Sequence, residues 1–134
     1  MLNLKKLLTK ILDHINPQQV GASGSVTVNA GQFYDICTVT LQPNSKYVVL
    51  ADLGSNNATQ HQCGLFIDIT SGTPAENFGN GLSRLVGYAG NGISAWKYIR
   101  TGSTSVTVRL RCYGYYTTSH TETGHLFAWR IGGA

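Results

Sequence analysis

Three side chains that could bind a metal ion fall close together near the C-terminal end of the chain. They are His120, Glu122 and His125, in the segment His120-Thr-Glu-Thr-Gly-His125. On a strand, His120 and Glu122 would share one side, because side chains alternate across a strand, and His125 could complete a site. Such spacings are common by chance, and the segment from Thr117 to Gly124 has the composition of an exposed loop. We therefore expect a solvated loop and no metal here, with a metal-dependent enzyme as the alternative.

Other kinds of catalysis find no support in the residue pattern. A glycosidase needs two carboxyl groups placed as acid and nucleophile. The acidic residues that could serve are scattered: Asp35, Asp52, Asp68, Glu76 and Glu122. The chain has no Gly-x-Ser-x-Gly elbow, and its Gly-Asn-Gly segments at 79–81 and 90–92 lack the Lys-Ser/Thr of a phosphate-binding loop. We expect no catalytic residues, no cofactor and no enzymatic activity.

Aromatic and cationic side chains that suit binding gather in the C-terminal third. Tyrosine and arginine are typical of protein interfaces, and aromatic rings beside polar groups also suit sugars. The two tryptophans, Trp96 and Trp129, are expected in the core instead. The candidate ligand-binding residues are Arg109, Arg111, Tyr113, Tyr115 and Tyr116.

The formal net charge of +4 does not indicate a nucleic-acid-binding protein. Lys5, Lys6 and Lys10 lie at the N-terminus, and the other basic residues are spread out rather than gathered in a stripe. No apolar run approaches the roughly 20 residues that cross a bilayer. The N-terminal lysines interrupt the apolar stretch, and no small-residue cleavage site follows it. We expect no nucleic-acid partner, no membrane insertion, and synthesis in a reducing cytoplasm.

The cysteine pattern agrees with that compartment. Cys37, Cys63 and Cys112 are each in phase with the apolar residues of a candidate strand. Buried free cysteine behaves as a small hydrophobic residue. We expect three free thiols, with one disulfide as the alternative.

Residues 2–15 are predicted to form an amphipathic helix that ends before Pro17. Its apolar residues repeat at a and d heptad positions and extend to the flanking e and g positions. Two heptads are too few for a self-sufficient coiled coil, so the stripe needs a partner. Sister helices are the preferred partner of this segment (residues 1–16), and the chain's own sheet or a membrane surface are the alternatives. The predicted oligomerisation residues are Leu4, Leu7, Leu8, Ile11, Leu12 and Ile15.

The remaining chain favours short strands joined by turns. Only 12% of residues are charged, and there are 16 glycines. After a polar linker at 17–24, apolar residues alternate with a period of two. The pattern predicts an all-β, antiparallel, eight-stranded jelly-roll sandwich over residues 25–134. The predicted strands are Ser25–Asn29, Phe33–Gln42, Lys46–Leu53, Gln62–Thr70, Leu82–Ala89, Ile93–Arg100, Thr104–Tyr113 and Leu126–Ile131.

One predicted strand is apolar on both faces. In Lys46–Leu53, Tyr47 and Val49 point one way, while Val48 and Leu50 point the other. A lone jelly roll has one solvent-facing side on each sheet. A second apolar side therefore indicates a subunit interface.

The order of the predicted elements, a short helix followed by a β domain, is similar to that of a known group of proteins. The stretch Leu4-Lys-Lys-Leu-Leu-Thr-Lys-Ile-Leu12 is followed directly by a Thr/Gly/Asn-rich β domain that ends in Leu126-Phe-Ala-Trp-Arg-Ile-Gly132. This layout resembles small structural proteins of bacteriophages and prophages, which are similar to the head domains of tail fibres and receptor-binding proteins. Those heads have a jelly roll like that of tumour necrosis factor (TNF) and complement C1q. The resemblance implies a homotrimer with its helices on the three-fold axis and a distal surface that binds a host glycan or protein.

From this resemblance we expect a virion structural protein, made in the host bacterial cytoplasm, that forms a trimeric receptor-binding head of the tail-fibre type. A non-viral carbohydrate-binding or protein-interaction module is the first alternative, and it predicts a monomer with an aromatic groove. A metal-dependent jelly-roll enzyme of the cupin type is the second.

Overall fold

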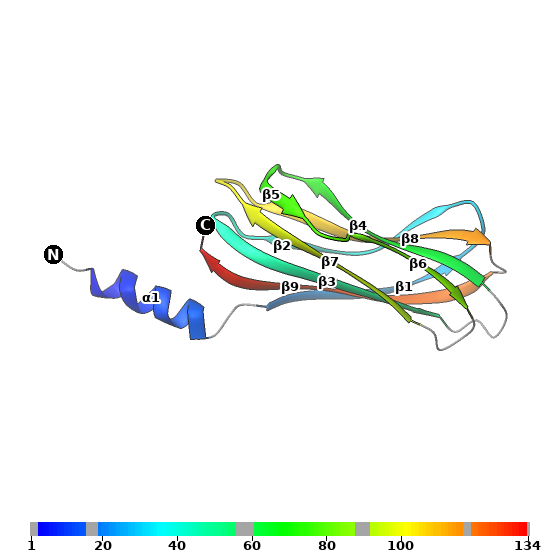
Figure 1. The fold of residues 1–134 in the computed structure, drawn as a ribbon, viewed down its shortest axis with the longest axis horizontal. Coiled ribbons are helices and arrows are strands. Elements are labelled where there is room, and N and C mark those ends of the chain that lie inside the picture. The colour runs from blue at the N-terminus through cyan, green and yellow to red at the C-terminus, as the bar shows by residue number, and fades with distance from the viewer. Residues whose placement is uncertain (1–2, 16–18, 56–60, 88–91, 117–118, 134) are drawn as a thin grey trace.

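The computed structural model describes residues 3–15, 19–55, 61–87, 92–116 and 119–133. Over these residues, a short helix is followed by strands that run along a long sandwich (Figure 1). The elements are α1 (Leu4–Ile15), β1 (Gln19–Val28), β2 (Phe33–Leu41), β3 (Ser45–Ser55), β4 (His61–Ser71), β5 (Pro74–Phe78), β6 (Leu82–Gly87), β7 (Gly92–Thr101), β8 (Val106–Tyr116) and β9 (His120–Gly133).

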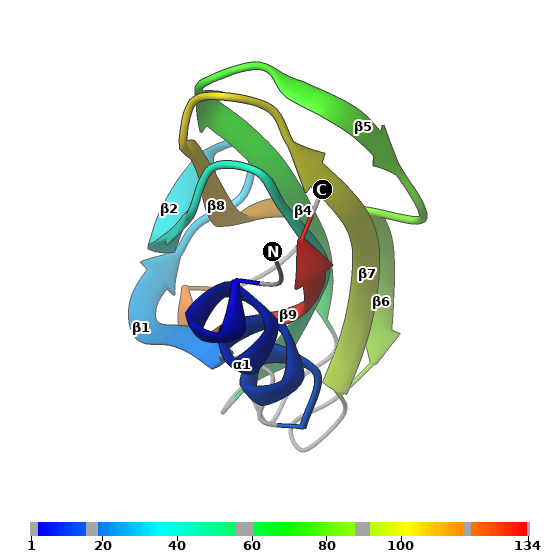
Figure 2. The same cartoon turned by 90° about the vertical axis from the view of Figure 1, so that its left-hand side faces the viewer.

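The strands form two antiparallel sheets that pack face to face (Figure 2). One sheet has five strands in the order β1-β9-β3-β7-β5, and the other has four in the order β2-β8-β4-β6. If the edge strand β5 is left aside, the two sheets have the strand orders β1-β9-β3-β7 and β2-β8-β4-β6. These are the strand orders of an eight-stranded jelly roll. The jelly-roll sandwich predicted from the sequence is therefore confirmed, with one added edge strand.

Side chains that point between the two sheets form one core. Alternate residues of the central strands β3 and β8 are buried, as a period of two requires. The sheets approach closely where Gly124 of β9 lies over Leu110 of β8: a Cβ on Gly124 would lie 2.7 Å from Leu110 Cδ2. Tyr47 is buried in the same core, and its hydroxyl accepts a hydrogen bond from the Gln42 backbone N–H at 3.0 Å.

The strands differ most from the sequence prediction at three places. Residues 19–24, predicted as linker, form the first part of β1, which pairs with β9 along its whole length. The edge strand β5 has a proline and mostly exposed residues, so its sequence lacks a strand pattern. β9 begins at His120 rather than Leu126, so the predicted loop is wrong over residues 120–124. Hydrogen bonding to β1 on one side and β3 on the other holds this Thr- and Gly-rich segment extended.

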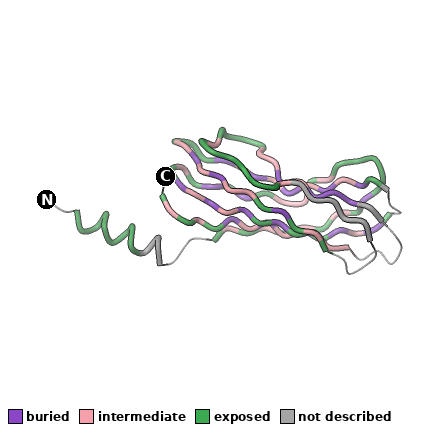
Figure 3. The backbone as a smooth tube through the Cα atoms, in the orientation of Figure 1, coloured by how far each residue is buried: buried purple, intermediate pink, exposed green. Residues whose placement is uncertain are grey.

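The helix α1 extends away from the sandwich instead of lying along it (Figure 1). Asn3 caps its N-terminus, because its side-chain oxygen accepts a hydrogen bond from the Lys6 backbone N–H at 3.1 Å. Residues 4–11 of α1 are all exposed (Figure 3). The alternative in which the helix packs on its own sheet is therefore not the arrangement of this structure. Among the described residues, no helix is long and apolar enough to cross a membrane.

The core assignment predicts the effect of truncating Leu110. Leu110→Ala should lower the free energy of unfolding by about 2–5 kcal/mol, because it leaves a cavity between the sheets under Gly124. The control is Thr107→Ala on the outer side of the same strand, which should cost about 0.5 kcal/mol or less. Urea denaturation measures both changes, and equal losses would contradict the assignment of the two sides of β8.

Candidate functional site

The outer surface of the five-stranded sheet is apolar across most of its width. Strand register places its outward side chains in rows that cross β5, β7, β3 and β9. Two adjacent rows, called here the aromatic face, hold Phe78, Tyr98, Val48 and Trp129, and then Trp96, Leu50 and Phe127.

The aromatic face is exposed in the single chain. Leu50, Trp96 and Trp129 are 44%, 45% and 42% exposed. The prediction that both tryptophans lie in the core is therefore wrong. Their strand neighbours Ala95 and Ala128 take the inward positions and are buried. Both sides of each strand carry apolar residues, so the sequence alone does not reveal which side the second sheet covers.

A polar row borders the aromatic face. Asp52 Oδ1 and His125 Nδ1 lie 2.7 Å apart, and both side chains are about half exposed. The His125 ring lies parallel to Phe127, with 6.2 Å between ring centroids. His125 therefore points outward from β9, whereas His120 and Glu122 point inward. The structure separates the three potential metal ligands that the sequence placed together.

The outer surface of the four-stranded sheet carries a network of ion pairs. Arg111 Nε lies 3.0 Å from Asp35 Oδ1, and Arg109 Nη2 lies 3.2 Å from Asp68 Oδ2. Longer contacts of 3.5 Å and 3.7 Å join each arginine to the other carboxylate. The two predicted ligand-binding arginines are thus neutralised by neighbouring side chains.

Aromatic rings extend this network along the same surface. Phe33 packs on Tyr113 with 4.6 Å between ring centroids, and Tyr113 packs on Tyr115 at 4.8 Å. The Arg111 guanidinium lies 4.4 Å from the centroid of the Phe33 ring, in a cation–π contact. The predicted ligand-binding arginines and the tyrosines at 113 and 115 therefore share one surface. The side chain of Tyr116 lies outside the part of the chain that the structure describes.

The predicted oligomerisation residues form an exposed stripe on α1. Leu4 is 72% exposed and Leu8 is 56% exposed. No described part of the sandwich covers this stripe. Its other exposed members are Leu7 and Ile11, and the side chains of Leu12 and Ile15 lie outside the described ones.

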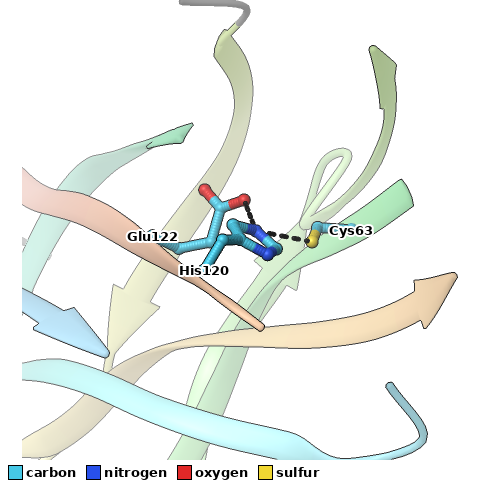
Figure 4. Close-up of side chains that lie close together, drawn as sticks. All are labelled: Cys63, His120 and Glu122. Atoms are coloured by element: carbon cyan, nitrogen blue, oxygen red, sulfur yellow. Dashed lines mark hydrogen bonds and ion pairs between the residues drawn. The ribbon is translucent and has the colours of Figure 1, made fainter. Parts of the chain in front are cut away.

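Three polar side chains meet inside the sandwich (Figure 4). His120 and Glu122 point inward from β9, and Cys63 approaches them from β4 in the opposite sheet. His120 Nε2 lies 2.7 Å from Glu122 Oε1 and 3.7 Å from Cys63 Sγ. The His120 and Glu122 side chains are 2% and 0% exposed. Water does not reach these polar atoms, so their contacts within the cluster supply hydrogen bonding in place of solvent.

The buried cluster corrects the prediction of a solvated loop around His120. The sequence contained one signal for it, because His120 and Glu122 are in phase with the inward residues Leu126 and Ala128. The partner Cys63 is distant in sequence and is brought there only by packing of the two sheets.

The cysteines are free thiols, as predicted. Burial raises the pKa of the Cys63 thiol far above its usual range, and the negative charge of Glu122 raises it further. The same two causes, burial first, raise the pKa of Cys112 to about 12. Both groups are therefore protonated at neutral pH. Burial also raises the pKa of Cys37.

Comparison with known proteins relates the chain to others by fold only. No protein-family model matches the sequence, and no curated protein matches it. Similar solved structures include viral, phage baseplate and spore appendage proteins and a xylanase.

Three of these matches illustrate the likeness. A chain of infectious bursal disease virus, Gx strain, shares the fold with a TM-score of 0.50 and 12% identity, over 89% of this chain and 34% of that one. The capsid structure of Helicobacter pylori bacteriophage KHP30 matches with a TM-score of 0.45 and 15% identity, over 88% of this chain and 96% of that one. The tripod from the baseplate of bacteriophage Tuc2009 matches with a TM-score of 0.42 and 13% identity, over 82% and 63%. The match to the infectious bursal disease virus chain shows a shared fold.

Proposed function

We propose that this protein is a structural component of a bacteriophage or prophage virion, made in the host bacterial cytoplasm. In this proposal it forms a homotrimeric, TNF/C1q-like receptor-binding head of the tail-fibre type, and its role is assembly and recognition rather than catalysis. One observation carries the proposal: a single chain leaves two apolar surfaces exposed, the stripe on α1 and the aromatic face. The fold supports it, since a chain of infectious bursal disease virus has the same architecture.

The helix requires partners to be stable. α1 has only 12 residues, and an isolated helix shorter than about 12–15 residues is marginal in water. The cap at Asn3 contributes about 1 kcal/mol, which does not offset that weakness. Its stripe has the heptad spacing that packs against copies of the same helix. Sister helices would bury Leu4, Leu8 and Ile11 together.

The aromatic face suits a second copy of the chain better than a small ligand. Its centre contains the aliphatic residues Val48 and Leu50, which offer no hydrogen bonds to a sugar. The Asp52–His125 pair lies at its border, in the position of a polar rim around an apolar interface. Trp129 pairs with Gln19, the first residue of β1, and α1 extends from that end of the sandwich (Figure 1). One interface would therefore cover both the helix and this face.

Assembly through the aromatic face would leave the outer surface of the four-stranded sheet exposed. Phe33 and Tyr115 are 47% and 39% exposed there, beside the neutral Arg/Asp network. Aromatic rings next to fixed polar groups suit a glycan or a protein partner. We place receptor binding around Phe33 and Tyr115, at the aromatic part of this surface.

The helix stripe can be tested by paired substitutions. Leu8→Ser with Ile11→Ser should weaken the trimer by at least about 100-fold, because each buried aliphatic side chain contributes about 1.5–3 kcal/mol. The matched control is Lys6→Ser with Lys10→Ser on the other side of α1. Sedimentation equilibrium measures both, and an unchanged association constant for the leucine and isoleucine variant would contradict the role of the stripe.

The aromatic face can be tested with a single charge. Leu50→Glu should also weaken the trimer by at least about 100-fold, because assembly would bury a carboxylate without a partner. Thr40→Glu places the same charge on the outer side of the other sheet and should leave the mass unchanged. Dissociation of both variants, or of neither, would argue against this face as the interface.

Receptor recognition can be tested on the assembled protein. Tyr115→Ala should reduce binding to a bacterial-surface glycan array, or to intact cells, by at least about tenfold without changing the mass. Thr38→Ala, on the outer side of the same sheet, is the control. Equal binding by both variants would place the receptor site elsewhere.

A further inference from the structure

The buried cluster joins the two sheets through three different metal-binding groups. Cys63 comes from the four-stranded sheet, and His120 and Glu122 come from the five-stranded sheet. The thiol sulfur, the imidazole nitrogen and the carboxylate oxygen all lie within 4.8 Å of one another. They are held by strands rather than by a loop, so their separation is set by the packing of the two sheets.

The distance from the imidazole nitrogen to the thiol sulfur matches a tetrahedral zinc site, and the distance from that nitrogen to the carboxylate oxygen is shorter. Zn–N and Zn–O bonds of about 2.0–2.1 Å and Zn–S bonds of about 2.3 Å place a ligand nitrogen roughly 3.6 Å from a sulfur and roughly 3.3 Å from an oxygen. In the structure, His120 Nε2 is 3.7 Å from Cys63 Sγ and 2.7 Å from Glu122 Oε1. The Glu122 oxygen would therefore move away from His120 Nε2 by about 0.6 Å when a tetrahedral ion binds.

The charges also balance. A zinc ion carries two positive charges, and a thiolate and a carboxylate carry one negative charge each, with a neutral imidazole as the third ligand. The bound site would therefore be neutral, which suits side chains that are 2% and 0% exposed. Thiolate and imidazole together favour zinc over magnesium or calcium.

We propose that Cys63, His120 and Glu122 bind a zinc ion that links the two sheets of the jelly roll. Zinc would replace the proton of the Cys63 thiol, which would pass to solvent, and would bind the ring nitrogen of neutral His120 that carries no proton. The three residues supply three of the four ligands of a tetrahedral ion, and a water molecule is the expected fourth. The site lies near the first residue of β9 and the last residue of β3, at the end of the sandwich far from α1 (Figure 1).

The test uses the full chain, freed of metal and titrated with Co²⁺ alone and then with Zn²⁺. Cobalt bound by Cys63 should give a thiolate-to-cobalt charge-transfer absorption, which zinc should abolish at one equivalent per chain. Cys63→Ala should lose this absorption. The matched control Cys37→Ala removes a half-buried thiol outside the cluster and should retain it.

A second measurement separates loss of the ligand from loss of the fold. Saturating zinc should raise the Tm of the unmodified protein by roughly 5–10 °C, and should leave the Tm of Glu122→Gln nearly unchanged. No cobalt absorption and no zinc-dependent rise in Tm of the unmodified protein would overturn the proposal and leave only a buried hydrogen bond between His120 and Glu122. Undiminished cobalt absorption by Cys63→Ala would overturn it equally.

Discussion

The two-sided apolarity of the five-stranded sheet is the constraint on which the rest of this structure depends. Side chains alternate across a strand, so β3, β7 and β9 each present one set of residues to the second sheet and another to the outside. The inner set forms the core around Tyr47 and Leu110. The outer set includes Leu50, Trp96 and Trp129, which the single chain leaves exposed. The helix α1 also has exposed apolar residues. From these two exposed apolar surfaces we infer that another molecule buries them.

The sequence predicts the fold well, because a period of two depends on the local chain alone. The strands around Val39, Val49 and Val108 are apolar on one side or both, and all three residues are buried as expected. The helix from Leu4 likewise follows from local spacing. The sequence predicts the structure less well where pairing with neighbouring strands determines the conformation of a segment. The segment at His120 is extended because β1 and β3 pair with it, and the sequence around it contains no strand signal strong enough to show this.

In the candidate sites too, the sequence predicts what lies within one strand and misses what comes from other strands. The sequence identifies Arg109, Arg111, Tyr113 and Tyr115 as one outward set, and the structure places them on one surface. It does not foresee that Asp35 and Asp68 neutralise the arginines, because these carboxylates come from β2 and β4. The sequence also groups His125 with His120 and Glu122, whereas an odd spacing in one strand puts it on the opposite side. Cys63 joins the cluster only through packing of the two sheets.

The central claim is that the exposed apolar surfaces are covered by copies of the same chain. The mass of the unmodified protein in solution tests it most directly, by sedimentation equilibrium over micromolar concentrations. The account predicts a particle of three chains of 14.4 kDa each. A single chain of 14.4 kDa throughout that range would contradict it and favour a monomeric binding module.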